Sequence, residues 1–337
     1  MNKVFITGAN GQMGSYLCAL LHDRDYDIYG LVRRKANPDF KNILSLIGKK
    51  NFNLVHGDIE DASLISGIIA EKQFDLIFNL CAMSFVHYSY NNPYQCMLTN
   101  YGGVINIAQA VRLHSPHSRL LQSSTSEMYG GINNKPNTEI TRFVPKSPYA
   151  ESKLAAYWHI VNLRDAYDIF ACNSICHNNE SSRRGIEFVT QKVIMAAANY
   201  SRFGKGVLEI GNMEAKRDWG HSIDYVRGMV LMLEHDKPDD YVLATGEAHS
   251  VRELIELAYG MAGVSIRWEG TGQNEVGRDD RNDKMVVAVK PEFYRPTEVN
   301  VLVGDPSKAE KVLGWKRQYN FVSLIEDMYR AAIDSQH

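Results

Sequence analysis

Four side chains in two nearby stretches of the sequence have the types and spacing of an acid–base set. Thr125 and Glu127 lie in the stretch SSTSEMYG, and Tyr149 and Lys153 lie in the stretch SPYAESK. Tyr149 and Lys153 are four residues apart, so they share a face if this stretch is helical. A tyrosine and a lysine also occur at this spacing by chance on many helices. Taken alone, the pair leaves redox chemistry and chance spacing open.

The chemistry available to this set is the oxidation of an alcohol. A phenol with a pKa of about 10 is a poor base at neutral pH, but a lysine ammonium and a positively charged nicotinamide would both stabilise the phenolate. Tyr149 could then take the hydroxyl proton of a substrate while hydride leaves to a nicotinamide ring. Thr125 could hold the same hydroxyl oxygen from the other side.

Glu127 adds a second step to this chemistry, because plain alcohol oxidation needs no carboxylate two residues beyond the threonine. Once a ketone exists, the neighbouring C–H is acidic. A glutamate above it could take that proton and return it to a leaving hydroxyl, so that water is eliminated. Hydride held by the cofactor can then reduce the resulting enone, and the cofactor ends as it began. The alternative for Glu127 is a surface or helix-capping carboxylate.

A glycine-rich turn near the N-terminus predicts a dinucleotide site. The apolar run KVFITG reads as a strand covered on both faces, and the run SYLCALLHD reads as a helix. Glycines at the turn between them let backbone N–H groups approach a pyrophosphate, and the helix N-terminus attracts its charge. The alternative is a glycine-rich turn without a ligand. The expected contacts of this turn are Gly8, Gly11, Gln12, Met13 and Gly14.

The second strand ends in two arginines, which predicts NADP as the cofactor. An acidic residue at that place would hydrogen-bond a ribose 2′-hydroxyl, whereas Arg33 and Arg34 suit a 2′-phosphate. The alternative is a solvated basic loop. Asp58, at the carboxyl end of the third strand, is placed to meet an adenine amino group. We include Ile59, Leu80, Ala82, Ser84, Tyr149 and Lys153 in the same cofactor site.

The order of elements predicts an α/β protein with a doubly wound parallel sheet of the Rossmann type, because strands and helices alternate without an internal repeat. The strand RLLQSS delivers Thr125 and Glu127 at its carboxyl end, where ligands of open α/β sheets bind. Past IFACNSICHN the alternation lapses, and DYVLATGE reads as a return to the large sheet. We therefore expect an NADP-binding domain over 1–175 plus 218–248, and a smaller interleaved α/β substrate lobe over 176–217 plus 249–337.

Two local patterns in the second half concern structure alone. Ser250 precedes an apolar-periodic run and has Glu253 three residues later, which is the spacing of a capping box. The charged stretch RDDRNDK at 278–284 is expected to be a solvated loop.

Composition excludes several classes of protein. The 337 residues carry a formal charge of −2 with 45% hydrophobic content, so the basic excess of a nucleic-acid binder is missing. Neither a signal peptide nor a run of transmembrane length is visible. The five cysteines have no CxxC spacing, which favours reduced thiols in a cytoplasmic protein over disulfides or a metal site.

These motifs resemble those of the extended short-chain dehydrogenase/reductase family, and within it those of the GDP-mannose 4,6-dehydratases. The similarity runs through GQMGSYL, VRR, STSEMYG, SPYAESKLAAYW, ESSRRGIEFVT, GNMEAKRDWGHSIDYV and YRPTEVNVLVGD. It implies oxidation at C4 of a GDP-sugar by Tyr149, assisted by Lys153 and Thr125. It further implies that Glu127 removes the C5 proton and supports loss of water from C6.

The resemblance also implies a GDP site built mainly by the smaller lobe. Arginine forks make paired hydrogen bonds to a diphosphate, although a single arginine is more often a surface ion-pair partner. By motif, the expected contacts are Asn178, Glu180, Lys192, Arg217 and Arg295. We include Ser84, Thr125, Ser126, Glu127 and Glu298 in the same substrate site.

Departures from the family pattern keep the sugar and the assembly open. The chain has GQMG for GQDG, Met83 for the glutamine of AQS, Asn179 for the histidine of FNHE, and Gln191 for the arginine of TRK. Met83 and Asn179 are expected near the sugar. The loop after Arg34 is short, which leaves a homodimer and a homotetramer open.

Three other functions therefore stay open. The first is a 4,6-dehydratase of a related GDP-sugar, such as a GDP-manno-heptose. The second is a GDP-sugar 4-reductase or C4 oxidase, which would not need Glu127. The third is an NADP-sensing regulator, which would keep the glycine turn and lose the tyrosine.

Overall fold

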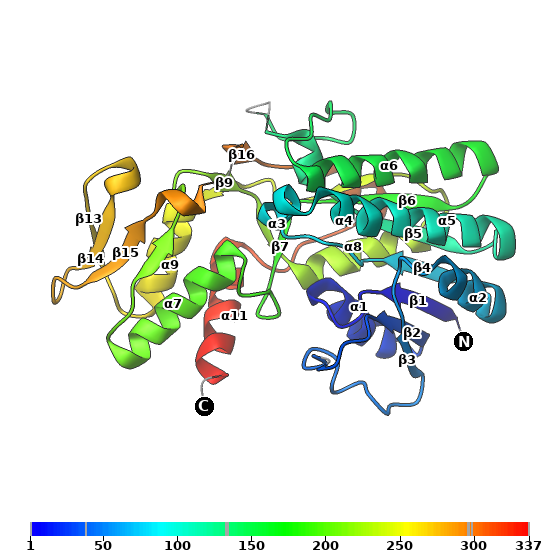
Figure 1. Ribbon diagram of the computed structural model, residues 1–337, viewed down its shortest axis with the longest axis horizontal. Coiled ribbons are helices and arrows are strands. Elements are labelled where there is room, and N and C mark those ends of the chain that lie inside the picture. Colours follow the sequence, from blue (N-terminus) through cyan, green and yellow to red (C-terminus); the bar gives the residue numbers. More distant parts are fainter. Residues whose placement is uncertain (1, 38, 132–134, 295–296, 298, 336–337) are drawn as a thin grey trace.

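The computed structural model describes residues 2–37, 39–131, 135–294, 297 and 299–335. The chain is arranged around two main sheets, one of seven strands and one of four. Each sheet has its own helices, and the first strand belongs to the larger body while the last helix packs in the smaller one (Figure 1).

The seven-stranded sheet is parallel throughout and has the strand order β11-β6-β5-β4-β1-β2-β3. This confirms the prediction of a doubly wound parallel sheet. Short, continuously apolar strands form it because both of its faces are covered by helices. Its strands are β1 (Lys3–Thr7), β2 (Asp27–Val32), β3 (Phe52–His56), β4 (Leu76–Asn79), β5 (Arg119–Thr125), β6 (Ala171–Cys176) and β11 (Tyr241–Leu243).

Two apolar cores lie on opposite faces of this sheet, because successive side chains of a strand point to opposite faces. Val4 and Ile6 of β1 pack with α1 (Gln12–His22) and α8 (Ser222–Glu234), whereas Phe5 packs on the other face. The helices of that other face are α2 (Ala62–Lys72), α5 (Gly103–His114) and α6 (Pro148–Tyr167).

The four-stranded sheet has the order β13-β14-β15-β8 and is antiparallel except for the β15–β8 pair. It packs with three helices in a separate apolar core, which includes Val193, Leu254, Val287 and Leu324. The strands are β8 (Leu208–Ile210), β13 (Ile266–Glu269), β14 (Val276–Asp279) and β15 (Met285–Val289), and the helices are α7 (Val189–Phe203), α9 (Val251–Met261) and α11 (Phe321–Asp334).

The chain passes between these two bodies several times. After β6 it forms the short strand β7 and the helix α7, and it then returns through β10 to α8 and β11. The pairing of β11 with β6 confirms that the DYVLATGE stretch returns to the large sheet. The exact division into two domains stays a prediction. The connecting strands are β7 (Asn178–Glu180), β9 (Lys216–Arg217), β10 (Trp219–His221), β12 (His249–Ser250) and β16 (Val301–Leu302).

The first local prediction is confirmed, and the second holds for residues 280–284, which form an exposed turn between β14 and β15. Ser250 caps α9 in a complete capping box with Glu253. Asp279, in contrast, is fully buried at the end of β14, where its carboxylate accepts hydrogen bonds from Tyr200 Oη at 2.9 Å and Arg281 Nη2 at 2.7 Å. These donors replace water, so the charged stretch folds inward at this residue.

The remaining helices are short. They are α3 (Val86–Asn91), α4 (Pro93–Met97) and α10 (Ser307–Leu313), with a π-helical turn over Leu98–Gly102. None of the helices within the described ranges is both long and apolar enough to cross a lipid bilayer.

Candidate active site

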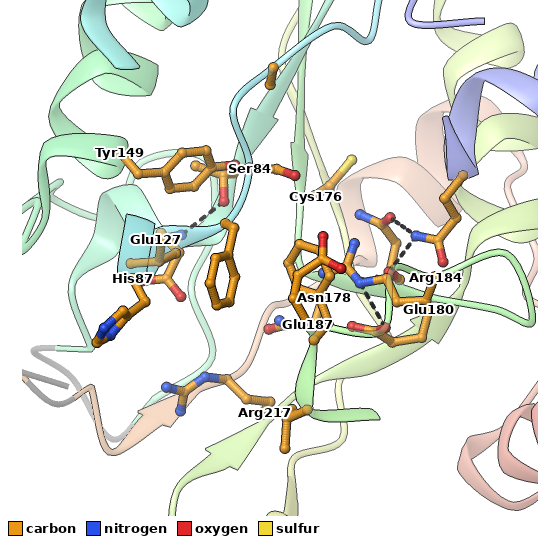
Figure 2. Close-up of a pocket in the computed structure, with 18 of the residues that line it drawn as sticks. Ser84, His87, Glu127, Tyr149, Cys176, Asn178, Glu180, Arg184, Glu187 and Arg217 are labelled. Atoms are coloured by element: carbon orange, nitrogen blue, oxygen red, sulfur yellow. Dashed lines mark hydrogen bonds and ion pairs between the residues drawn. The ribbon is translucent and has the colours of Figure 1, made fainter. Parts of the chain in front are cut away.

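A cavity of about 1010 Å³ opens between the two bodies of the protein. Its walls come from the carboxyl ends of strands in the large sheet, from the segment around β7 and from the start of α7. Ligands of open α/β sheets bind at this edge. Figure 2 shows Tyr149, Ser84 and Glu127 on one side of the cavity and Glu180, Arg184 and Glu187 on the other.

The four predicted catalytic side chains converge at one end of this cavity. Thr125 is the last residue of β5, and Glu127 follows in a 3₁₀ turn. The backbone N–H of Glu127 donates to Thr125 Oγ1 at 3.3 Å, so the threonine side chain caps this turn. Helix α6 starts at Pro148, and the Ser147 hydroxyl caps it by accepting from the Ala150 N–H at 3.1 Å. Proline at the first helical position and serine at the cap favour a helix start here.

Burial shifts the pKa values of both acid–base residues on α6 toward the neutral forms. It raises the pKa of the Tyr149 phenol, and the hydrogen bond between Tyr149 and Thr125 opposes that rise. It lowers the pKa of Lys153 to about 8. The Lys153 ammonium donates to the Ser123 carbonyl at 2.9 Å. The protein alone therefore favours a protonated phenol, so the lower pKa expected of a general base requires positive charge brought by a ligand.

The glycine turn has the geometry of a phosphate cradle. Gly8 has a φ of +67°, and a Cβ added at Gly14 would lie 2.2 Å from the Gly8 carbonyl oxygen. Only glycine fits these two positions, because the turn folds tightly onto the start of α1. Gly11 occupies the N-cap of α1 and has no side chain to cap it, so the first N–H groups of the helix face the cavity end. This arrangement fits a dinucleotide diphosphate.

The predicted residues for the adenosine end lie outside the cavity lining. Arg33 Nε is 2.8 Å from Asp58 Oδ2, so the structure brings these two predicted residues together as an ion pair. Glu60 lies 3.8 Å from the same guanidinium. Arg34 is exposed, and Ile59 is buried against Gly103.

The loop after β4 carries Leu80, Ala82 and Ser84 into the cavity lining, together with Gln12 and Met13 of the glycine turn. Met83 is different. Its backbone N–H donates to Asn100 Oδ1 at 2.8 Å, and its side chain packs with Val86, Cys96 and Tyr149 in a small apolar cluster. Of the two residues expected near the sugar, Asn179 lines the cavity, whereas Met83 is not among the lining residues and packs beside Tyr149.

The predicted substrate residues within the described part of the chain line the same cavity. They are Ser84, Thr125, Ser126, Glu127, Asn178, Glu180, Lys192 and Arg217. The Glu180 carboxylate is buried and accepts from Thr190 Oγ1 at 2.6 Å, with Arg184 Nε at 3.1 Å. The predicted contacts Arg295 and Glu298 lie outside the described residues.

Several cavity residues were missed by the sequence reasoning. Arg184 pairs with Glu180 across the turn after β7, where the four-residue spacing carries no helical signal, and its guanidinium lies 3.5 Å from the centre of the Phe188 ring. Phe188 meets Phe85 edge to face, with ring centres 5.6 Å apart. Phe293 lies under the Lys192 ammonium at 3.7 Å. Phe85 and Phe188 had no local signal, because they meet only when the two bodies pack together.

Comparison with known proteins identifies relatives of the whole chain. The family model described as GDP-mannose 4,6 dehydratase matches residues 5–328. The human protein named GDP-mannose 4,6 dehydratase is 40% identical over 342 residues, which is 99% of this chain and 92% of that protein. The GDP-mannose 4,6-dehydratase of Sinorhizobium fredii is 41% identical over 332 residues, covering 96% of this chain and 95% of that protein.

A solved structure with the same fold is DesIV, a dTDP-glucose 4,6-dehydratase from Streptomyces venezuelae with NAD and TYD bound. It superposes with a TM-score of 0.83 at 22% identity, and the match covers 99% of this chain and 98% of that one. At this identity the similarity establishes the shared fold.

Proposed function

The chain belongs to the GDP-mannose 4,6-dehydratase family, and from this membership we propose that it converts GDP-mannose to GDP-4-keto-6-deoxymannose with loss of water. One observation carries the proposal beyond family membership. Glu127 lies in the same cavity as Thr125, Tyr149 and Lys153, so an elimination base accompanies an alcohol-oxidising set. A simple alcohol dehydrogenase has no use for this second base.

Tyr149 acts in the first half of the reaction. Its phenol oxygen, hydrogen-bonded to Thr125, takes the proton of the sugar C4 hydroxyl. Lys153 and Thr125 position the phenol oxygen of Tyr149 and the C4 hydroxyl oxygen of the sugar, since Lys153 is anchored to the same strand that carries Thr125. The strand and the helix thus hold the reacting groups at a constant separation, which is the main way in which a rigid scaffold accelerates such a step.

Glu127 acts in the second half. The C4 ketone acidifies the C5 proton, and the Glu127 carboxylate takes it and passes it to the departing C6 hydroxyl. Its place in a 3₁₀ turn directly after β5 keeps it within two residues of Thr125, so both steps use one binding pose of the sugar. Proton removal and water loss therefore occur on one face of the sugar.

We propose NADP as the nicotinamide cofactor. Bound in the cavity, it would supply a hydride acceptor for the oxidation at C4 and the same hydride for the later reduction at C6, so that no external reductant would be consumed. The glycine turn at the start of α1 would hold its diphosphate. Arg34 is exposed beside the end of β2 and would contact a 2′-phosphate, whereas Arg33 is engaged by Asp58.

The GDP part of the substrate would lie toward the smaller body. Lys192 and Arg217 line the cavity on the side of the smaller body and supply positive charge there. A guanidinium and an ammonium suit the two phosphate groups. Asn178 and Glu180 come from the neighbouring strand β7 and would contact the sugar or the ribose.

The direct test is incubation of the purified protein with GDP-mannose and no added cofactor, followed by mass spectrometry. Appearance of a product lighter by one water, without net NADPH consumption, supports the proposal. Absence of that product with GDP-mannose, together with water loss from a GDP-manno-heptose, would assign the chain to the related sugar instead. Stoichiometric NADPH consumption would indicate a 4-reductase.

The assembly and the cellular location also stay proposals. We propose a homodimer or a homotetramer in the cytoplasm, without nucleic acid or membrane as partner. Light scattering of the purified protein measures the first, and a monomer would contradict it.

A further inference from the structure

One segment of the chain, Asn178–Arg184, joins the glycine turn to the substrate side of the cavity. The Gln12 side-chain amide donates to the carbonyl oxygen and to Oδ1 of Asn179, at 3.0 Å each. The Gln12 side-chain oxygen accepts from Ser181 Oγ at 2.9 Å. Gln12 is the first residue of α1, and these partners are 167 and 169 residues away in the chain. Both the nitrogen and the oxygen of the Gln12 side-chain amide therefore bond to this segment.

A second contact fastens the same segment to α1. Arg183 Nη1 donates to Ser15 Oγ at 3.0 Å, and its guanidinium stacks on Tyr16 at 4.0 Å from the ring centre. Ser15 is buried, so its hydroxyl has exchanged water for these protein partners. Both ends of the contact, at Asn179 and at Arg183, therefore rest on the first turns of the helix that begins at the glycine turn.

The neighbouring residues of the same segment face the substrate side. Asn179, which bonds to Gln12 of α1, also lines the cavity beside Asn178 and Glu180, and Arg184 pairs with Glu180. Figure 2 shows Glu180 and Arg184 together at the cavity wall. The segment that Gln12 holds therefore also carries Glu180 and Arg184 of the cavity wall.

We infer that Gln12 is a positioning residue that couples the cofactor site to the substrate site through Asn179 and Ser181. A ligand on the glycine turn and a ligand on the β7 side both stabilise the arrangement in which Gln12 holds this segment. Each should therefore strengthen the binding of the other by the same factor, since coupling between two sites is reciprocal. The inference rests on the proposed function, because it needs a dinucleotide on one side and a GDP-sugar on the other.

The experiment measures release of NADPH from the holoenzyme, with and without GDP as an unreactive substrate-site probe. Bound NADPH is displaced by excess NADP⁺, and the loss of its fluorescence gives the release rate. In the wild-type protein we expect saturating GDP to slow release by about tenfold, within the usual range for coupled sites. In Gln12→Leu, whose apolar side chain is one atom shorter and cannot hydrogen-bond, we expect less than about a twofold effect.

Two further variants separate positioning from simple destabilisation. Ser181→Ala removes one bond to Gln12 and should reduce the GDP effect, and adding it to Gln12→Leu should change nothing more, because both act through one contact. Tyr157→Phe removes a buried hydrogen bond to Asp240 and none of the bonds of Gln12. It should lower the melting temperature and keep the full GDP effect.

The outcomes distinguish the coupling from the function itself. If calorimetry shows that GDP does not bind the wild-type protein, the proposed substrate class fails. If GDP binds and does not slow NADPH release, the coupling alone is refuted. A full GDP effect in both Gln12→Leu and Ser181→Ala would also overturn the role of Gln12. The same holds if Gln12→Leu releases NADPH faster by one factor both with and without GDP.

Discussion

The ammonium of Lys153 lies 2.9 Å from the carbonyl oxygen of Ser123, so the catalytic helix is tied to the strand that ends in Thr125. The lysine is 3% exposed, which makes this bond its main replacement for water among the described residues. The bond between Lys153 and Ser123 keeps Tyr149 of α6 in reach of Thr125. It also places the Lys153 ammonium in a buried site, where its charge lowers the stability of the folded protein. The first prediction concerns that cost.

The buried ammonium of Lys153 should lower stability at neutral pH. Its pKa is about 8 in the folded protein, below its ordinary value of 10.5, so below pH 8 the folded state carries a poorly solvated charge. The difference corresponds to about 3 kcal/mol. As pH rises from about 8 to 10.5, the folded state loses this proton before the unfolded chain does, and the group's contribution to stability becomes more favourable.

Lys153→Met should therefore gain most over the wild-type protein at pH 7 and lose that advantage by about pH 10.5. The gain at pH 7 is below 3 kcal/mol, because the Ser123 carbonyl loses its donor at a cost of about 1–3 kcal/mol. Urea unfolding of both proteins between pH 7 and 10 measures the difference. A difference that stays constant across this range would show that Lys153 does not titrate as described.

Glu127→Gln should separate the two halves of the reaction. The amide cannot take the C5 proton, so water loss should fall by about 10²–10⁴-fold while oxidation at C4 continues. Mass spectrometry of quenched reactions would detect the 4-keto sugar that still holds its C6 hydroxyl. Glu187→Gln changes a carboxylate on the opposite wall of the same cavity and serves as the matched control, with dehydration retained. Normal dehydration by Glu127→Gln contradicts its role.

Cofactor preference should depend on Arg34 more than on Arg33. Both arginines are exposed, but Arg33 Nε is held by Asp58 at 2.8 Å. Losing a charged hydrogen bond to a 2′-phosphate should weaken NADP binding by about 10–100-fold in Arg34→Ala and leave NAD binding unchanged. Arg33→Ala should have the smaller effect on NADP. Fluorescence titration with both reduced cofactors measures this, and an equal loss for NADPH and NADH in Arg34→Ala argues against 2′-phosphate recognition.

Phe85 should contribute to recognition of the sugar. It follows Ser84 in the cavity lining, remains 37% exposed, and meets Phe188 of the other body edge to face. A ring at this place can cover the C–H face of a sugar beside Glu127. Phe85→Ala should weaken GDP-mannose binding by about tenfold, corresponding to about 1.4 kcal/mol of apolar contact, and leave GDP binding unchanged.

Phe293→Ala is the control for this prediction. Phe293 supports the Lys192 ammonium at 3.7 Å, so its loss should weaken GDP and GDP-mannose binding together. Calorimetry with both ligands gives the two affinities for each variant. Equal losses for GDP and GDP-mannose in Phe85→Ala would place that ring at the nucleotide.

The local sequence was sufficient for the sheet, the glycine turn and the catalytic helix. Continuous apolar strands alternating with helices indicated a doubly wound parallel sheet, and the edge rule for such sheets predicted that Thr125 and Glu127 meet a ligand. Ser147 and Pro148 marked the start of α6, and the four-residue spacing put Tyr149 and Lys153 on one face. These features depend on short-range periodicity and on rules shared by all parallel sheets, so they can be read residue by residue.

Tertiary structure alone decided which side of a loop or strand a residue faces. Met83 turns into a small apolar cluster beside Tyr149, Asp279 is buried by Tyr200 and Arg281, and Arg33 is engaged by Asp58. The link from Gln12 to Asn179 spans 167 residues, and the contact of Phe85 with Phe188 joins the two bodies. Such contacts depend on how separately folded elements pack, and packing leaves no periodic signal in either partner's own sequence.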